Sequence, residues 1–148
     1  MEINMFAKQL TVFIENRTGR LSEVLGVLKN NGVNILSLSL ADTTEFGLLR
    51  LIVDNPEVGK VKLSENGFSS LLSDVSIIKI SHKVGSLQEL LKAIDESGVN
   101  IEYMYGLSIE AEEAYVVLKA SDVKKVDEIL DKHGIETVAC DHIAKNIK

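Results

Sequence analysis

Two glycines and two asparagines recur in this chain at one spacing, and their chemistry suits the binding of a small polar molecule. Gly19 and Asn34 reappear 66 positions later as Gly85 and Asn100. A glycine before a helix lets the chain turn sharply and leaves the helix N–H groups accessible to an anion such as a carboxylate. An asparagine amide carries donors and an acceptor, which suits a ligand with an ammonium and a carboxylate. We expect each asparagine to lie close to the glycine loop of its own repeat when the helix between them packs back on the sheet. The same residues also have a purely structural explanation, because turns and helix ends need glycine with or without a ligand.

These residues belong to a longer repeat. The segment NRTGRLSEVLGVLKNNGVNI (residues 16–35) aligns with HKVGSLQELLKAIDESGVNI (residues 82–101), and GVNI is identical in both. A segment repeated at a fixed offset usually marks a repeated folding unit. We therefore interpret the chain as a duplication and expect one domain in residues 1–73 and a second in residues 74–148.

Each half predicts a strand, a helix, two strands, a second helix and a closing strand. Residues 10–14 alternate apolar and other side chains, as in a strand with one buried face. Apolar residues then fall at i, i+3, i+4 and i+7, as on one face of a helix. These helix stripes are Leu21, Val24, Leu25 and Leu28 in the first half and Leu87, Leu90, Leu91 and Ile94 in the second. Gly32 and Gly98 follow as the expected left-handed residues at the helix ends.

Hairpins are predicted next, in residues 35–53 and 101–119, since each segment has two strand-like runs around a polar stretch. Asn55-Pro56 and Ser121-Asp122 then indicate the starts of two more helices. FSSLL and IETVAC read as the closing strands. This βαββαβ order predicts an α+β fold of two ferredoxin-like domains, each a four-stranded antiparallel sheet with two helices on one face.

The starts of the two first helices differ in sequence. Ser86 and Glu89 form the pattern S-x-x-E of a capping box, whereas Arg20 occupies the position of the serine in the first repeat. We hypothesise that the helix start at Gly19 is open to a ligand carboxylate. The helix start at Gly85 would be closed by its own cap.

The composition argues against several classes of protein. The chain has 16 Lys and Arg against 22 Asp and Glu, a net charge of −6, which disfavours nucleic acid as a partner. An RNA-binding domain of this fold would also need aromatic residues on its middle strands, where this chain carries Leu and Val. Cys140 is the only cysteine, and it forms no metal-ligand spacing with His82, His133 or His142. We expect no metal and no cofactor.

Targeting and catalytic motifs are also missing. The opening residues MEINMFAKQL do not resemble a signal peptide, and no apolar run is long enough to span a membrane. We therefore expect a cytoplasmic protein with no membrane partner. No GxSxG, P-loop or Cys–His pattern is present. We expect that the chain is not an enzyme.

The segment ENRTGRLSEVLGVLKNNGVNI (residues 15–35) closely resembles the signature of the ACT domain, in which an N-R-P-G-x-L loop opens the first helix and G-[IV]-N-I ends it. The resemblance covers both halves and is greatest to stand-alone tandem ACT proteins. It implies a free amino acid bound at an interface between two ACT domains. By position, the favoured ligand-binding residues of the first repeat would be Asn16, Arg17, Thr18, Gly19, Leu21, Asn34 and Ile35, with Arg20 at the helix start. The weaker candidates of the second repeat are His82, Lys83, Val84, Gly85, Leu87, Asn100 and Ile101, with Ser86 at the helix start.

Three positions depart from the family pattern. Thr18 and Val84 stand where the family usually has proline, and His82 replaces the loop asparagine. Because His82 replaces the asparagine that would contact the ligand, we expect the main site in the first repeat.

The predicted function is that of a regulatory amino-acid sensor. The chain would form a homodimer or larger homo-oligomer and act through an enzyme partner or through its own assembly. The alternative is a protein–protein interaction module without a ligand. Leu36, Leu38 and Leu40 alternate with small residues and fit an edge strand that pairs with another domain under either interpretation.

Overall fold

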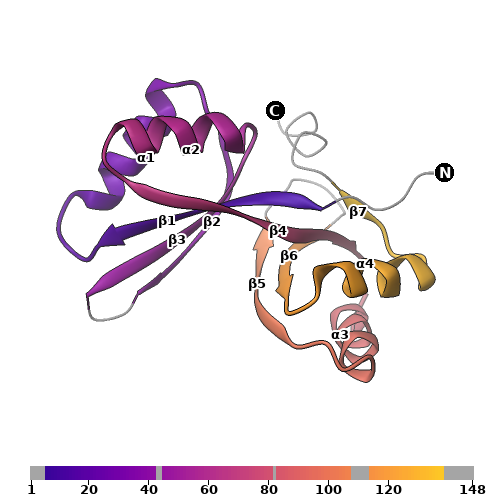
Figure 1. The fold of residues 1–148 in the computed structure, drawn as a ribbon. Helices are drawn as coiled ribbons and strands as arrows, with labels where there is room; N and C mark the ends of the chain where they lie inside the picture. The colour runs from indigo at the N-terminus through magenta and orange to yellow at the C-terminus, as the bar shows by residue number, and fades with distance from the viewer. Residues whose placement is uncertain (1–5, 43–44, 82, 108–113, 139–148) are drawn as a thin grey trace. The chain divides into compact units, whose positions relative to one another are not determined.

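Both repeats form the predicted order of strands and helices (Figure 1). The structure, a computed structural model, describes residues 6–42, 45–81, 83–107 and 114–138. The first repeat contains β1 (Ala7–Glu15), α1 (Arg20–Asn30), β2 (Ile35–Asp42), β3 (Phe46–Val53), α2 (Pro56–Glu65) and the start of β4 (Ser69–Ile80). The second continues β4 and adds α3 (Ser86–Glu96), β5 (Ile101–Leu107), β6 (Ala114–Ala120), α4 (Val123–Lys132) and β7 (Thr137–Val138). The fold is α+β and contains two ferredoxin-like units, as predicted.

The first compact unit is Lys8–Ser73, and the second continues from Asp74. β4 passes from one unit into the next as a single strand of 12 residues, where the sequence indicates two separate strands. The predicted closing strand of the second half is described only as far as Val138. Cys140, His142 and His82 lie outside the described residues.

The strand order is equivalent in the two units. In the first it is β2-β3-β1-β4, and in the second it is β7-β4-β6-β5. β3 pairs with both β1 and β2 in antiparallel register, so β1 and β2 run parallel to each other. β2 and β5 lie at the edges of these described strand sets, and the register shifts near the start of each.

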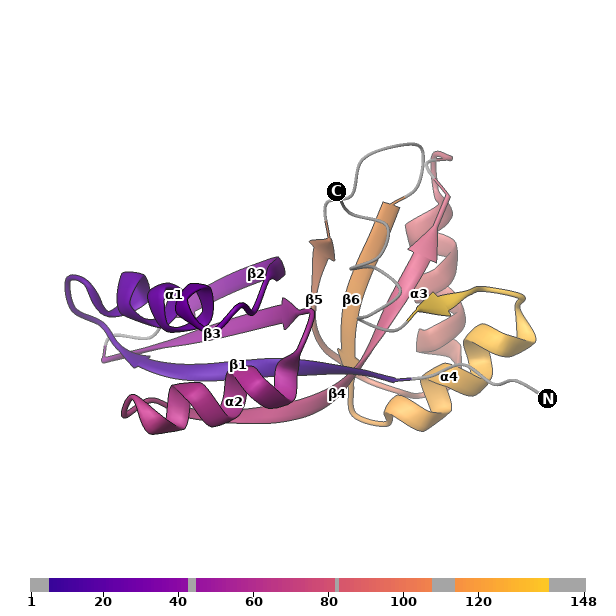
Figure 2. The same ribbon diagram turned by 90° about the horizontal axis from the view of Figure 1, so that it is seen from above.

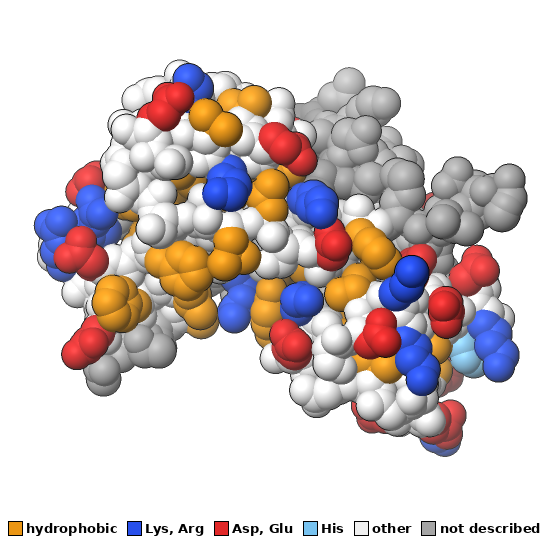
Figure 3. Space-filling model, viewed as in Figure 1, with side chains coloured by type: hydrophobic (Ala, Val, Ile, Leu, Met, Phe, Trp, Pro, Cys, Tyr) orange, Lys and Arg blue, Asp and Glu red, His pale blue; other side chains and the backbone are white. Residues whose placement is uncertain are grey.

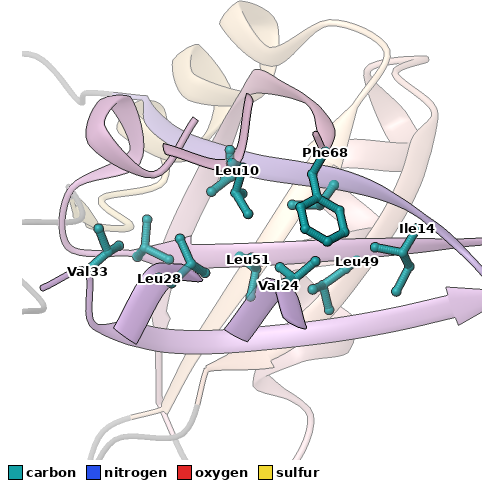
Figure 4. Packing of buried hydrophobic residues seen from close by; sticks show 11 residues of the cluster. Leu10, Ile14, Val24, Leu28, Val33, Leu49, Leu51 and Phe68 are labelled. Atoms are coloured by element: carbon teal, nitrogen blue, oxygen red, sulfur yellow. The ribbon is translucent and has the colours of Figure 1, made fainter. Parts of the chain in front are cut away.

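The core of the first unit lies between the sheet and its two helices. α1 and α2 lie on one side of β1 and β3 (Figure 1). The inward strand residues Leu10, Val12 and Ile14 are buried, as their alternation predicts. They pack with Val24, Leu28, Val33, Leu49, Leu51, Val53, Leu63 and Phe68. The ring of Phe68 points into this cluster (Figure 4).

The second unit has a corresponding cluster of buried side chains. α3 and α4 lie on one side of β5 and β6 (Figure 2). The core consists of Ile78, Leu90, Ile94, Val99, Leu118, Ala120, Val126 and Leu130. The predicted helix stripe is wrong at Leu87, which is exposed and lies outside this cluster, whereas its equivalent Leu21 packs against the core of the first unit.

Helix ends follow the predicted signals. The Oδ1 atoms of Asn55 and Asp122 accept hydrogen bonds from Val58 N (3.3 Å) and Lys125 N (3.0 Å), which caps α2 and α4. Gly32 and Gly98 have φ values of 71° and 84°, in the left-handed region expected after α1 and α3. The spacing of the elements is therefore set by local signals in both repeats.

The backbone conformations of Gly26 and Gly32 predict opposite effects of an alanine substitution on stability. A Cβ on Gly26 or on Gly32 would meet no atom within 4 Å, but only Gly32 has a positive φ. Gly26→Ala should therefore raise the free energy of unfolding by about 0.5–1 kcal/mol, because alanine favours the helix. Gly32→Ala should lower it by about 1 kcal/mol, because a side chain is strained in that conformation. Urea unfolding of both variants tests this, and changes of equal sign would contradict it.

Candidate ligand-binding site

The loop between β1 and α1 is held at the end of the sheet where β3 begins. The N–H of Asn16 donates to the carbonyl of Glu45 (3.2 Å), and the N–H of Arg17 donates to the carbonyl of Glu15 (2.8 Å). The side chains of Asn16, Arg17 and Thr18 are exposed. The backbone thus fixes the loop and leaves its side chains accessible.

Both first helices begin in the same way. Gly19 and Gly85 are the residues before α1 and α3, with φ values of 90° and 88°, and neither helix start has a side-chain cap. The predicted capping box is wrong, because Ser86 is already the first residue of α3 and lies one position too late to cap it. The hypothesis of one open and one closed helix start therefore loses its basis.

Arg20 introduces a different asymmetry between the repeats. Its Nη1 lies 2.9 Å from Glu23 Oε2, and its Nη2 lies 3.8 Å from Glu15 Oε1. The guanidinium carbon stacks 4.3 Å from the centre of the Phe68 ring, a cation–π contact. Its Nε is buried and has no hydrogen-bond partner in the described part of the chain. Arg20 is therefore held against the core by contacts within its own repeat.

Asn34 lies at the start of β2, beside the end of β3. Its N–H donates to Asp54 Oδ1 (2.9 Å), and its carbonyl accepts from the N–H of Asp54 (3.0 Å). Its side chain is exposed, and the amide has no partner among the described residues. Ile35, the next predicted residue, is half-buried and packs on the core.

The loop and the asparagine of one repeat do not meet. The loop is bonded to Glu45 and Asn34 is bonded to Asp54, at the two ends of β3. Nine residues of extended chain span roughly 30 Å. The expectation that Asn34 lies close to the Gly19 loop within one domain is therefore wrong. It overlooked the direction of β2, which starts at the far end of α1.

The second repeat has the same separation. Asn100 exchanges hydrogen bonds with Ser121, which follows the end of β6: its N–H donates to Ser121 Oγ (3.1 Å) and its carbonyl accepts from Ser121 N (2.8 Å). The loop follows Ile80, which pairs with Ala114 at the start of β6. Lys83 and Val84 in this loop are exposed, and Ile101 after Asn100 is half-buried.

Two grooves each contain at least two of the predicted residues. Asn34 and Ile35 line a groove of about 370 Å³ together with Leu25 and Lys29. Lys83, Gly85 and Leu87 line a groove of about 540 Å³ in the second repeat, with Ser81, Gln88, Leu91 and Ala114. Sequence reasoning missed the polar neighbours Lys29 and Gln88. Leu25 and Leu91 belong to the predicted helix stripes and line these grooves.

Within the described ranges, no group of three or more His, Cys, Asp or Glu side chains is placed to hold a metal ion. No described helix is long and apolar enough to cross a membrane.

Two βαββαβ units, each with a left-handed glycine before its first helix, define the chain as a tandem ferredoxin-like protein. Residues 5–147 match the family described as "ACT domain pair". The chain belongs to this family, and the resemblance noted in its sequence is confirmed.

Similar proteins include the small subunit of acetolactate synthase isozyme 3 from Escherichia coli and from Salmonella typhimurium. Each is 35% identical over 72 residues, which cover 49% of this chain and 43% of the subunit. The match thus spans less than half the length of these relatives. The crystal structure of protein BT0572 from Bacteroides thetaiotaomicron is 35% identical, with a TM-score of 0.89, and the match covers 95% of this chain and 97% of that one.

A more distant similarity concerns the fold alone. The regulatory subunit of aspartate kinase from Thermus thermophilus is 14% identical and has a TM-score of 0.63, with 88% of this chain and 94% of that chain covered. The tandem arrangement of such units therefore occurs in a protein with little sequence similarity to this one.

The contacts of Asn34 predict that its side chain is dispensable for folding. Asn34→Ala should change the free energy of unfolding by less than about 0.5 kcal/mol, since only backbone atoms of Asn34 are bonded. Asp54→Ala should cost about 1 kcal/mol, because it removes the acceptor for the Asn34 N–H. Urea unfolding measures both. A loss of stability in Asn34→Ala as large as that in Asp54→Ala would contradict the assignment.

Proposed function

We propose that this protein is a non-catalytic regulator that binds a free amino acid at an interface between two ACT domains. One observation carries the proposal: the glycine loop and the asparagine lie at opposite ends of β3. Neither half of the site can reach a ligand held by the other half within the same domain. A small ligand that contacts both therefore requires a second domain.

The edge strand β2 provides a way to join two domains. β2 runs parallel to β1, so it ends on the side of the sheet that carries the Gly19 loop and starts on the side that carries Asn34. Antiparallel pairing of β2 with β2 of a second copy of the chain would bring Asn34 of one copy toward the loop of the other. The ligand site would then be made by both copies.

The two halves of this site have complementary chemistry. The N–H groups at the start of α1 have no side-chain cap and favour a carboxylate. The side-chain oxygen of Asn34 can accept a hydrogen bond from an ammonium group. A ligand that bridges them would stabilise the assembled state over the separated one, and the partner would respond to that state.

The relatives support an enzyme as this partner. The matched proteins from Escherichia coli and Salmonella typhimurium are small subunits of acetolactate synthase. We propose that the present chain likewise regulates an enzyme that is encoded separately. We also propose that residues 1–73 and 74–148 are its two ACT domains. A cytoplasmic location stays a prediction.

A second candidate function is assembly without a ligand. Leu38 and Leu40 are 47% and 48% exposed on β2, although both occupy the face of the sheet that the helices cover. Such an apolar edge strand favours pairing with another chain even when no ligand is bound. The two candidates differ only in whether an amino acid is bound.

Thermal unfolding in the presence of each of the twenty free amino acids tests the sensor. A ligand at 100 times its Kd adds about 2.7 kcal/mol and raises Tm by several degrees. We expect one amino acid, or a few related ones, to raise Tm. Asn34→Ala should abolish the shift and Asn100→Ala should retain it. If none of the twenty raises Tm, the sensor is excluded and the interaction module remains.

Sedimentation velocity tests the assembly. The double variant Leu38→Lys, Leu40→Lys should shift the protein from dimer to monomer, because it places two charges on the apolar edge. Met104→Lys is the matched control, since Met104 pairs with Leu118 in the second repeat as Leu38 pairs with Leu51 in the first. A dimer that survives the double variant, or that Met104→Lys disrupts equally, would contradict pairing through β2.

A further inference from the structure

The second repeat contains a groove on the helical side of its sheet. It has a volume of about 580 Å³, within the size range of small-molecule sites. Its apolar floor is formed by Ile80 from β4, Leu90 and Ala93 from α3, and Ile135 after α4. The groove therefore lies between the first helix of the repeat and the turn that ends the second.

The turns that end α2 and α4 identify equivalent positions in the two repeats. The N–H of Phe68 donates to the carbonyl of Leu63 (2.9 Å), and the N–H of Ile135 donates to the carbonyl of Leu130 (2.8 Å). Both turns pass through a left-handed glycine. Ile135 therefore replaces Phe68. By the same logic Ser86 replaces Arg20, because each is the first residue of a helix after a left-handed glycine.

In the first repeat these positions fill the corresponding space. Phe68 is 5% exposed and its ring lies in the core cluster (Figure 4). The Arg20 guanidinium covers this ring, with its carbon 4.3 Å from the ring centre. In the second repeat a serine and an isoleucine replace that stacked pair. Ala93 also replaces the larger Val27, at the offset of 66 positions.

The second repeat is consequently less tightly packed at this place. Ile14 belongs to the buried cluster of the first repeat, whereas its equivalent Ile80 is only partly buried, as is Ile135. The groove thus arises because smaller side chains occupy these positions of the second repeat, while the backbone follows the same path in both repeats.

The rim of the groove carries charges of both signs. Glu89 and Glu96 project from α3, with Lys92 between them in sequence, and Lys79 lies on β4. Lys79 Nζ is 3.8 Å from Glu136 Oε1. Figure 3 shows apolar atoms between acidic and basic side chains on the face that carries α3 and α4. A molecule with an apolar body and two opposite charges matches this combination of floor and rim.

We propose that this groove is a second binding site, for a small zwitterion with an apolar side chain. The side chain would lie on the apolar floor, with the ammonium toward the glutamates and the carboxylate toward the lysines. This site lies within one unit and needs no second domain. It is therefore independent of the interface site proposed above, and either site can exist without the other.

NMR titration of the isotope-labelled full chain with L-leucine tests the proposal. Signals of Ala93 and Ile135 should shift in a saturable manner. Three probes each lack one group of L-leucine and so test the contribution of that group to binding. Glycine lacks the apolar side chain, 4-methylpentanoate lacks the ammonium, and 3-methylbutylamine lacks the carboxylate. Each should bind at least about tenfold more weakly than L-leucine, which corresponds to about 1.4 kcal/mol. Absence of shifts at Ala93 and Ile135 with L-leucine would overturn the proposal.

Matched variants test the origin of the groove. Ser86→Arg with Ile135→Phe recreates the stacked pair of the first repeat and should abolish the shifts at Ala93. If this double variant does not fold, the exposed rim variant Glu89→Gln with Glu96→Gln should weaken L-leucine binding at least about tenfold. Unchanged affinity in a folded variant of either kind would overturn the proposal. Shifts confined to Gly19 and Asn34 would likewise overturn it while supporting the interface site.

Discussion

The antiparallel pairing of β3 with both β1 and β2 is the constraint on which the proposed site depends. It makes β1 and β2 parallel, so the loop after β1 and the asparagine before β2 must lie at opposite ends of the sheet. No side-chain movement closes a gap of roughly 30 Å. A ligand that contacts both the glycine loop and the asparagine therefore has to be bound by more than one domain. The proposed regulatory role rests on this geometry, because occupancy of the proposed site and association of domains would be linked.

Much of the fold was predictable because its signals are local. Asn55 and Asp122 cap their helices, Gly32 and Gly98 end theirs, and alternation at Leu10, Val12 and Ile14 marks a buried strand face. The site was less predictable because it depends on distances between segments. The residues of the Gly19 loop and Asn34 were identified by motif, but their separation depends on strand direction. The capping box failed by one residue, since a serine after the left-handed Gly85 is inside the helix.

The two repeats show how one backbone supports different surfaces. Their helix starts, turns and strand register shifts coincide, so the differences lie in side chains. Arg20 and Phe68 close the space between helices in the first repeat, and Ser86 and Ile135 leave it open in the second. Leu38 and Leu40 are exposed on the edge strand β2, and the equivalent positions of the second repeat are Met104 and Gly106. Duplication thus leaves one copy suited to pairing and the other with a groove of its own.

The edge position of β2 also determines how steeply the protein would respond to its ligand. Antiparallel pairing of two identical strands has two-fold symmetry, so one contact between two copies creates two equivalent sites at once. At protein concentrations where separated chains are in equilibrium with the pair, the first ligand bears the free-energy cost of association, and the second binds to an assembly that already exists. Saturation would then follow a sigmoidal curve with a Hill coefficient above one. A narrow change in amino-acid concentration would be enough to switch the population of the protein.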